Sequence, residues 1–194
     1  MKGYTQKFTQ TFFEVNSPTP NTDAIRLLLA LAATTRMPLF HDDCKSTYLH
    51  ATIDIKDGLF TYQPEGFEET DPETGEQYLW RLKSSVYGTR QAGRQWMRCL
   101  TDHLFEIGFK RLAYEACAFY RMTQGRIIFL KVYVDDLLCM CTDAQTHDEF
   151  IQDMRARFQI TSRKLSKFLG CTVATEMSPL TQSQLMLELR SPNC

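Results

Sequence analysis

The chain has 194 residues, of which 43% are hydrophobic, and it carries a formal net charge of -1. This length suits one core of ordinary size, and the charge excludes an overall basic character that would by itself indicate nucleic-acid binding. No apolar run is long enough to span a membrane, and the first residues, MKGYTQ, form no signal segment. We therefore expect a soluble, intracellular and cytoplasmic protein with no membrane partner.

The cysteines indicate the same compartment. Seven of them are scattered along the chain without a CxxC pair or a His/Cys ligand spacing. This pattern argues against a disulfide framework and against a zinc site. Reduced, intracellular thiols are the interpretation that fits best.

The first predicted element is a buried helix. Residues 24–33 are apolar nearly all round, and Asn21 or Thr22 can cap the helix that they form. A strand is predicted around residues 39–43, after a proline, and another short strand is predicted at residues 58–62.

Charge is unevenly distributed after these strands. Between Glu65 and Glu76 there are six acidic residues and no basic one, whereas residues 77–101 contain five basic residues and no acidic one. Glycines and prolines within the acidic stretch predict an exposed loop. The local basic excess that follows is hidden by the overall charge.

The second half of the chain predicts further helices and strands around one hairpin. In chain order they are a helix at 94–107 ended by Gly108, strands at 127–134 and 137–141, a helix opened by the capping box 146–149, and a strand at 168–173. Together the elements predict an α+β domain in which helices pack on one face of an antiparallel sheet.

Asp135 and Asp136 separate the two apolar strands, and they are expected at the tip of the hairpin. Removing two adjacent like charges from water is costly unless a cation neutralises them. Oxygen ligands this close together suit a hard divalent ion, for which Mg²⁺ is the natural candidate. The alternative is that aspartate is simply common in turns.

Asp43 supplies a third carboxylate at the end of a predicted strand. Phosphoryl transfer by two metal ions needs carboxylates that converge from separate strands. A single aspartate followed later by an Asp-Asp hairpin is the order found in polymerase palms. A surface position is the alternative for Asp43 alone. A magnesium phosphatase or nuclease is a further alternative to a polymerase. Such an enzyme would need another acidic or histidine cluster, and the sequence shows none.

Seven short blocks carry a family resemblance. In order they are KGYTQ at 2–6, TFFEV with IRLLLALAA at 11–15 and 25–33, DCKSTYLH at 43–50, YQPEGF at 62–67, LKSSVYGTRQAGRQW at 82–96, YVDDLL at 133–138 and FLG at 168–170. In this order the blocks resemble the reverse transcriptase domain of copia-type long-terminal-repeat retrotransposons, nearly end to end.

The resemblance implies an RNA-directed DNA polymerase with a palm fold. Asp43, Asp135 and Asp136 would then be its catalytic, metal-binding triad, holding two Mg²⁺ ions, with Mn²⁺ as the alternative metal. The partners implied are an RNA or DNA template with its primer, and deoxynucleoside triphosphates (dNTPs). The reaction would transfer a nucleotide onto the primer 3′-hydroxyl.

The resemblance also assigns nucleotide-binding residues. Tyr48 would stack under the incoming sugar and exclude a 2′-hydroxyl, although a core aromatic is the alternative interpretation. Tyr87 and Gly88 would line the nucleotide and template pocket, where glycine allows close approach of the backbone.

Three arginines of the basic stretch would follow template or primer phosphates by electrostatic attraction. They are Arg90, Arg94 and Arg98. A merely solvated helix face is an equal alternative for them, and Trp96 is expected in the core.

The resemblance divides the chain into a remnant of the fingers at 1–20, a palm core at 21–175 and a truncated start of the thumb at 176–194. Other polyprotein segments would be partners if the chain belongs to a longer product, within a virus-like particle if the element is intact. The incomplete fingers and thumb leave an alternative function, an inactive retrotransposon remnant with at most weak nucleic-acid binding.

Several residues depart from the family pattern. Asp42 stands where the family has an apolar residue, and Thr89 and Gly93 replace a leucine and a proline. A carboxylate at position 42 is expected either to be exposed by a local shift or to destabilise the fold.

Overall fold

The computed structural model describes residues 6, 14–19, 21–53, 55, 58–163, 165, 167–168 and 171–172. The chain forms two compact units, of which the first comprises Met1–Ser17 and Ser46–Thr101. The second comprises Pro18–Lys45 and Asp102–Cys194. Each unit is described by itself.

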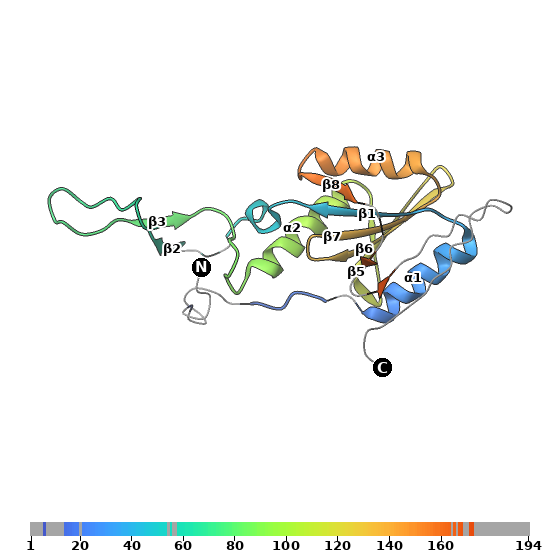
Figure 1. The fold of residues 1–194 in the computed structure, drawn as a ribbon, viewed down its shortest axis with the longest axis horizontal. Helices are drawn as coiled ribbons and strands as arrows, with labels where there is room; N and C mark the ends of the chain where they lie inside the picture. Colours follow the sequence, from blue (N-terminus) through green and yellow to red (C-terminus); the bar gives the residue numbers. More distant parts are fainter. Residues whose placement is uncertain are drawn as a thin grey trace. The chain divides into compact units, whose positions relative to one another are not determined.

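A six-stranded sheet forms the centre of the described part of the second unit, in the order β4-β5-β6-β7-β1-β8 (Figure 1). Every neighbouring pair in it is antiparallel. The strands are β1 (Leu39–Cys44), β4 (Lys110–Leu112), β5 (Glu115–Thr123), β6 (Arg126–Tyr133), β7 (Asp136–Cys141) and β8 (Ile160–Arg163). The predicted strands around 39–43, 127–134 and 137–141 are therefore confirmed.

Helices α1 (Thr22–Thr35) and α3 (Ala144–Arg155) belong to the second unit, and α2 (Ala92–Glu106) crosses into it at its last turn. Asn21 caps α1 as predicted, because its side chain accepts a hydrogen bond from the backbone N–H of Asp23 at 2.9 Å. The predicted capping box of α3 is wrong. Asp143 is the cap and accepts from the N–H of Thr146, since an aspartate three residues earlier is an equally good capping residue.

The helices do not share one face of the sheet, which corrects that part of the predicted arrangement. Ile25 and Leu29 of α1 pack against Leu138 of β7. His147 of α3 contacts Asp42 of β1, whose cross-strand partner Leu137 points to the face opposite Leu138. Residues 137–141 are apolar and buried without a break, so this strand needs cover on both faces. Figure 1 shows α1 and α3 on either side of the sheet.

The described part of the first unit contains a hairpin of β2 (Leu59–Tyr62) and β3 (Leu79–Leu82), the short 3-10 helix η2 (Thr47–His50) and most of α2. The strand predicted at 58–62 is confirmed, whereas β3 was not predicted. Residues 65–76 connect the two strands and are exposed throughout apart from Asp71, which is half-buried. The acidic stretch is therefore an exposed loop, as expected.

The last described elements are β9 (Lys167–Phe168) and β10 (Cys171–Thr172), which pair with each other. The single strand predicted at 168–173 is thus two short strands. The predicted start of the thumb at 176–194 lies outside the described residues, as do most residues of the predicted fingers remnant. No helix in the described ranges is long and apolar enough to cross a membrane.

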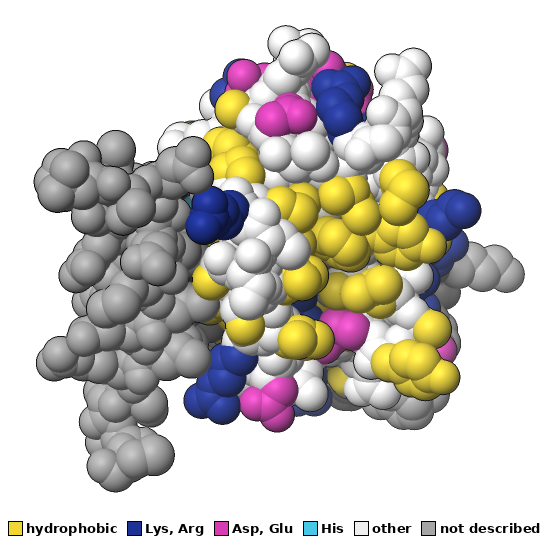
Figure 2. Space-filling view, turned by 90° about the vertical axis from the view of Figure 1, so that its right-hand side faces the viewer, with side chains coloured by type: hydrophobic (Ala, Val, Ile, Leu, Met, Phe, Trp, Pro, Cys, Tyr) yellow, Lys and Arg dark blue, Asp and Glu magenta, His cyan; other side chains and the backbone are white. Residues whose placement is uncertain are grey.

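Hydrophobic side chains gather on one side of the molecule (Figure 2). In the second unit, an apolar groove of about 250 Å³ lies between α1 and the sheet, and it is lined by residues that include Leu28, Phe129 and Leu31. Leu27, which also lines it, is 70% exposed.

Candidate active site and metal-binding carboxylates

The sheet brings Asp43 and Asp136 together. These residues are direct cross-strand partners at the ends of β1 and β7, and Asp135 precedes Asp136 in the turn that joins β6 to β7. The backbone N–H of Cys44 donates a hydrogen bond to the carbonyl of Asp135 at 2.9 Å, which fastens this turn to β1. The three predicted carboxylates therefore lie at one end of two adjacent strands.

Val134 gives the turn an unusual backbone. Its φ is 53°, in the left-handed region, where a β-branched side chain is strained. Strained residues of this kind persist only where the surroundings fix them, and they concentrate at functional sites. The strain at Val134 therefore marks the turn as a place where the position of Asp135 is held.

Two cations of the protein engage Asp43. Lys45 Nζ lies 2.7 Å from Oδ2 of Asp43, and Arg163 Nη2 lies 2.8 Å from its Oδ1. The side chain of Asp43 is only 7% exposed, so these ion pairs offset the cost of burying its charge. Nothing in the sequence pattern singled out Arg163, because strand pairing alone brings it to this site.

His41 is the neighbour of Asp136. Its Nε2 lies 2.9 Å from Oδ1 of Asp136, and Arg163 Nη1 lies 4.0 Å from the same oxygen. The sequence analysis missed His41, although a period of two along the strand would have placed it on the same face as Asp43. The carboxylate of Asp136 is more accessible than that of Asp43, with 29% of its side chain exposed.

The pKa of Asp135 indicates that the negative charge of this carboxylate is not fully compensated in the fold. Burial raises its pKa above the ordinary value, and the negative charges of Asp136 and Asp43 add to the rise. A hydrogen bond to its own backbone N–H and the charge of Arg163 oppose it. Oxygen ligands with excess negative charge are the donor set that Mg²⁺ or Mn²⁺ prefers, so the residues present fit such an ion.

Tyr48 and Tyr87 lie together in the first unit. Their ring centroids are 4.6 Å apart with an interplanar angle of 61°. Tyr87 is 55% exposed and Tyr48 is half-buried, so neither is a core aromatic. Gly88 follows with a φ of 89°, which residues with a Cβ rarely adopt. These three predicted nucleotide-binding residues thus form one local arrangement.

The predicted phosphate-binding arginines are also in the first unit. Arg98 and Arg90 are exposed, whereas Arg94 is half-buried and lies 2.6 Å from a carboxylate oxygen of Glu14. Trp96 on the same helix is 1% exposed, which confirms its predicted place in the core. The exposed pair remains compatible with either of its predicted roles.

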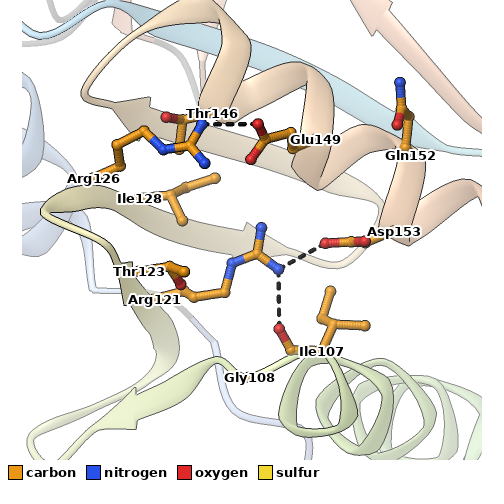
Figure 3. A pocket seen from close by; sticks show the side chains of 10 residues that line it. All are labelled: Ile107, Gly108, Arg121, Thr123, Arg126, Ile128, Thr146, Glu149, Gln152 and Asp153. Atoms are coloured by element: carbon orange, nitrogen blue, oxygen red, sulfur yellow. Dashed lines mark hydrogen bonds and ion pairs between the residues drawn. The ribbon is translucent and has the colours of Figure 1, made fainter.

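One cavity in the second unit lies away from the carboxylates. It has a volume of about 390 Å³ and lies between α3 and the β5–β6 hairpin, at the other end of β6 (Figure 3). Arg121 pairs with Asp153 at 2.7 Å, and Arg126 pairs with Glu149 at 2.8 Å. Because each guanidinium already has an acidic partner, the cavity carries no net charge that would attract an anion.

Asp42 is fully buried, and its surroundings explain why the fold accepts it. Ser162 Oγ donates a hydrogen bond to its Oδ1 at 2.6 Å, and His147 Nε2 lies 2.8 Å from its Oδ2. The expectation that this carboxylate would be exposed by a local shift is therefore wrong. The compensating partners come from β8 and α3, which are distant in the sequence.

Comparison with known proteins finds a matching family and several relatives. Residues 1–187 match a protein family described as "Reverse transcriptase (RNA-dependent DNA polymerase)". The chain is 29% identical over 170 residues to the retrovirus-related Pol polyprotein from transposon RE1 of Arabidopsis thaliana, in an alignment that covers 87% of the chain and 11% of that protein.

Two further relatives are more similar over shorter stretches. The chain is 31% identical over 144 residues to the Pol polyprotein from transposon TNT 1-94 of Nicotiana tabacum, which covers 74% of the chain and 10% of that protein. It is 31% identical over 133 residues to a putative transposon Ty5-1 protein of Saccharomyces cerevisiae, covering 68% of the chain and 41% of that protein. The chain thus spans 11% or less of the two Pol polyproteins.

Proposed function

The chain belongs to the reverse transcriptase (RNA-dependent DNA polymerase) family, as a domain of the copia type, and we propose that it forms the palm that adds deoxynucleotides to a primer 3′-hydroxyl. The pairing of Asp43 with Asp136, beside Asp135, is the observation that carries this proposal. The template would be RNA or DNA, and other segments of a Pol polyprotein would complete the enzyme. Its place would be a cytoplasmic particle.

The three aspartates would hold the metal ions from two strands and their connecting turn. Two bound divalent ions would lower the pKa of the primer hydroxyl and stabilise the departing pyrophosphate. Asp43 would exchange the cations of Lys45 and Arg163 for metal ligation. The released ammonium and guanidinium groups would then be available to the negatively charged triphosphate.

Residues of the first unit would select and hold the substrates. We assign Tyr48 to the sugar of the incoming nucleotide, where an aromatic ring would exclude a 2′-hydroxyl. Tyr87 and Gly88 would line the same nucleotide pocket, and the contact between the rings of Tyr87 and Tyr48 supports a common role. Arg90, Arg94 and Arg98 would bind the phosphates of template or primer.

One observation favours the second candidate, an inactive remnant. Both carboxylate oxygens of Asp43 are already engaged by cationic side chains of the protein. If these ion pairs were permanent, metal ions would not reach Asp43, and only weak nucleic-acid binding would remain.

Primer extension on a homopolymeric RNA template with Mg²⁺ tests the proposal. The control variant is Asp135→Asn/Asp136→Asn, and the charge-matched control Glu65→Gln/Glu68→Gln removes two carboxylates from the exposed acidic loop instead. We expect extension by wild type and by the loop variant, and none by the hairpin variant. Circular dichroism checks that each variant is folded. Every reaction contains the primer and dNTP. Folded wild type that gives no extension with either Mg²⁺ or Mn²⁺ would support the inactive remnant.

A further inference from the structure

A second cluster of metal-ligand side chains lies on the opposite face of β1 from Asp43. Asp42 of β1, Cys139 of β7 and His147 of α3 each offer one ligand atom, and these atoms all lie within 4.8 Å of one another. All three residues are buried. Successive residues of a strand point to opposite faces, so this cluster is separate from the carboxylates of the proposed polymerase site.

The separations within the cluster suit a tetrahedral ion. His147 Nε2 lies 2.8 Å from Asp42 Oδ2, and Cys139 Sγ lies 3.7 Å from the same oxygen. With zinc–ligand bonds of about 2.0–2.3 Å, neighbouring ligand atoms of a tetrahedral site lie roughly 3.3–3.6 Å apart. The two distances to Asp42 Oδ2 fall on either side of this spacing, and the ligand atoms of Cys139 and His147 lie within 4.8 Å of each other, so modest side-chain movements would open the site.

Neighbouring groups hold two of the ligands in place. Ser162 Oγ donates to the other oxygen of Asp42 at 2.6 Å, which leaves Oδ2 for the cluster. The ring of Phe40 stacks on the imidazole of His147, with centroids 3.9 Å apart and an interplanar angle of 6°. Such outer contacts orient the ligands of protein metal sites and tighten metal binding.

The chemistry of the donors selects the class of metal. A thiolate, an imidazole and a carboxylate suit Zn²⁺ or Co²⁺, whereas Mg²⁺ prefers oxygen ligands alone. One divalent ion with one thiolate, one carboxylate and a neutral imidazole has no net charge. Burying such a site therefore costs much less free energy than burying a charged one. Without metal, burial and the charge of Asp42 raise the pKa of the Cys139 thiol well above its ordinary value.

We propose that Asp42, Cys139 and His147 supply three ligands to a Zn²⁺ ion that joins β1, β7 and α3, on the opposite face of β1 from Asp43. The bound ion displaces the thiol proton of Cys139 to solvent and takes the place of the hydrogen bond between His147 and Asp42, with His147 bound through Nε2 as a neutral imidazole that keeps its proton on Nδ1. Position 42 lies 97 residues from Cys139 and 105 from His147. This distance explains why ligand spacing along the chain indicated no zinc site.

Cobalt binding tests the proposal on the complete chain. Because the site is buried, the protein is refolded from denaturant with Co²⁺ and then dialysed. We expect one Co²⁺ per chain and thiolate-to-cobalt absorption bands in wild type. Cys141→Ser is the matched control, since Cys141 is also buried on β7 but lies outside the cluster. The bands should remain in this control and disappear in Cys139→Ser.

Two further measurements make the outcome decisive. Refolding with Zn²⁺ should raise the Tm of wild type and of Cys141→Ser, but not that of Cys139→Ser. The variant Asp135→Asn/Asp136→Asn should keep the cobalt bands, because it alters only the proposed polymerase site. Folded wild type that retains no Co²⁺ or Zn²⁺ after dialysis would overturn the proposal without requiring any variant to fold. Bands that persist in Cys139→Ser would also overturn it.

Discussion

Arg163 and Asp43 form an ion pair, with Nη2 and Oδ1 2.8 Å apart, that links β8 to the end of β1. Lys45 engages the second oxygen of the same carboxylate at 2.7 Å. A divalent ion that binds Asp43 must therefore compete with two cations already in place. Because the Arg163 side chain is 47% exposed, solvent weakens its hold, and exchange with a metal ion costs little.

The substitution Arg163→Gln should tighten Mn²⁺ binding. Removing the guanidinium leaves Asp43 and Asp136 with more negative charge for the ion, and we expect an apparent Kd lower by about 3- to 10-fold. Electron paramagnetic resonance of free Mn²⁺ measures this directly. Arg155→Gln, an exposed arginine of α3, is the control and should leave the affinity unchanged. Weaker binding in Arg163→Gln would instead mean that the ion pair shapes the site.

Asp135 should make both metal binding and stability depend on pH. Its pKa is raised in the folded chain by burial and by the neighbouring carboxylates, so the native state holds its proton at pH values where the unfolded chain has lost it. In that window, which starts near the usual aspartate pKa of about 3.9, stability falls as pH rises. Mn²⁺ affinity should fall as pH drops through the raised pKa.

The variant Asp135→Asn checks this sign. Without metal, the melting temperature of the variant should match that of wild type at low pH and exceed it near pH 7. Thermal melts in EDTA across this range measure the difference. A variant that is less stable than wild type at pH 7 would show that the carboxylate charge is compensated.

Much of the end of the sheet that carries the three aspartates could be predicted from local pattern. The two apolar runs on either side of Asp135 and Asp136 predicted a hairpin, and a period of two along the strand would also have placed His41 on the same face as Asp43. Arg163 could not be found this way, because its role depends on β8 pairing with β1, which no nearby residue specifies.

The placement of helices required tertiary information. The apolar helix at the start of the chain and the helix after Asp143 were both recognisable, but the sheet face that each covers depends on how the strands pair. Asp42 shows the same limit at a single residue. From the sequence alone, burial of this carboxylate is expected to destabilise the fold. His147 from α3 and Ser162 from β8 compensate its charge, and only the tertiary structure brings them to it.

Breaking the buried pair of Asp42 and His147 should be costly, whereas replacing both partners should not. In EDTA, His147→Leu leaves the Asp42 carboxylate without its main partner, and we expect a loss of about 3–5 kcal/mol in the free energy of unfolding. The double variant Asp42→Leu/His147→Leu should recover most of that loss. Urea unfolding measures both values. A double variant as unstable as His147→Leu alone would contradict this interpretation.

Glu115 should stabilise the fold at neutral pH and lose this effect in acid. Burial alone would raise its pKa, but hydrogen bonds from Lys131 and from the backbone N–H groups of Cys117 and Asn21 bring it below the ordinary value. A depressed pKa contributes stability above the unfolded-state value and loses it as pH falls through the folded-state value. The difference in Tm between wild type and Glu115→Gln should therefore shrink from pH 7 to pH 3. Glu65→Gln, in the exposed loop, should show no such trend.

Relieving the backbone strain at Val134 should raise the stability of the fold and lower its activity. Val134→Gly removes a left-handed β-branched residue, which relieves about 1–2 kcal/mol, against roughly 0.5–1 kcal/mol of added chain entropy. We expect a slightly higher Tm, together with weaker Mn²⁺ binding and slower primer extension, because a freer turn no longer holds Asp135 in one position.

Gly125→Ala provides the converse control. Its φ is 78° in the β5–β6 turn at the other end of β6, with nothing within 4 Å of an added Cβ, so only backbone strain changes and Tm should fall without loss of metal binding. Unchanged Mn²⁺ affinity in Val134→Gly would show that pairing of β1 with β7 alone positions the carboxylates.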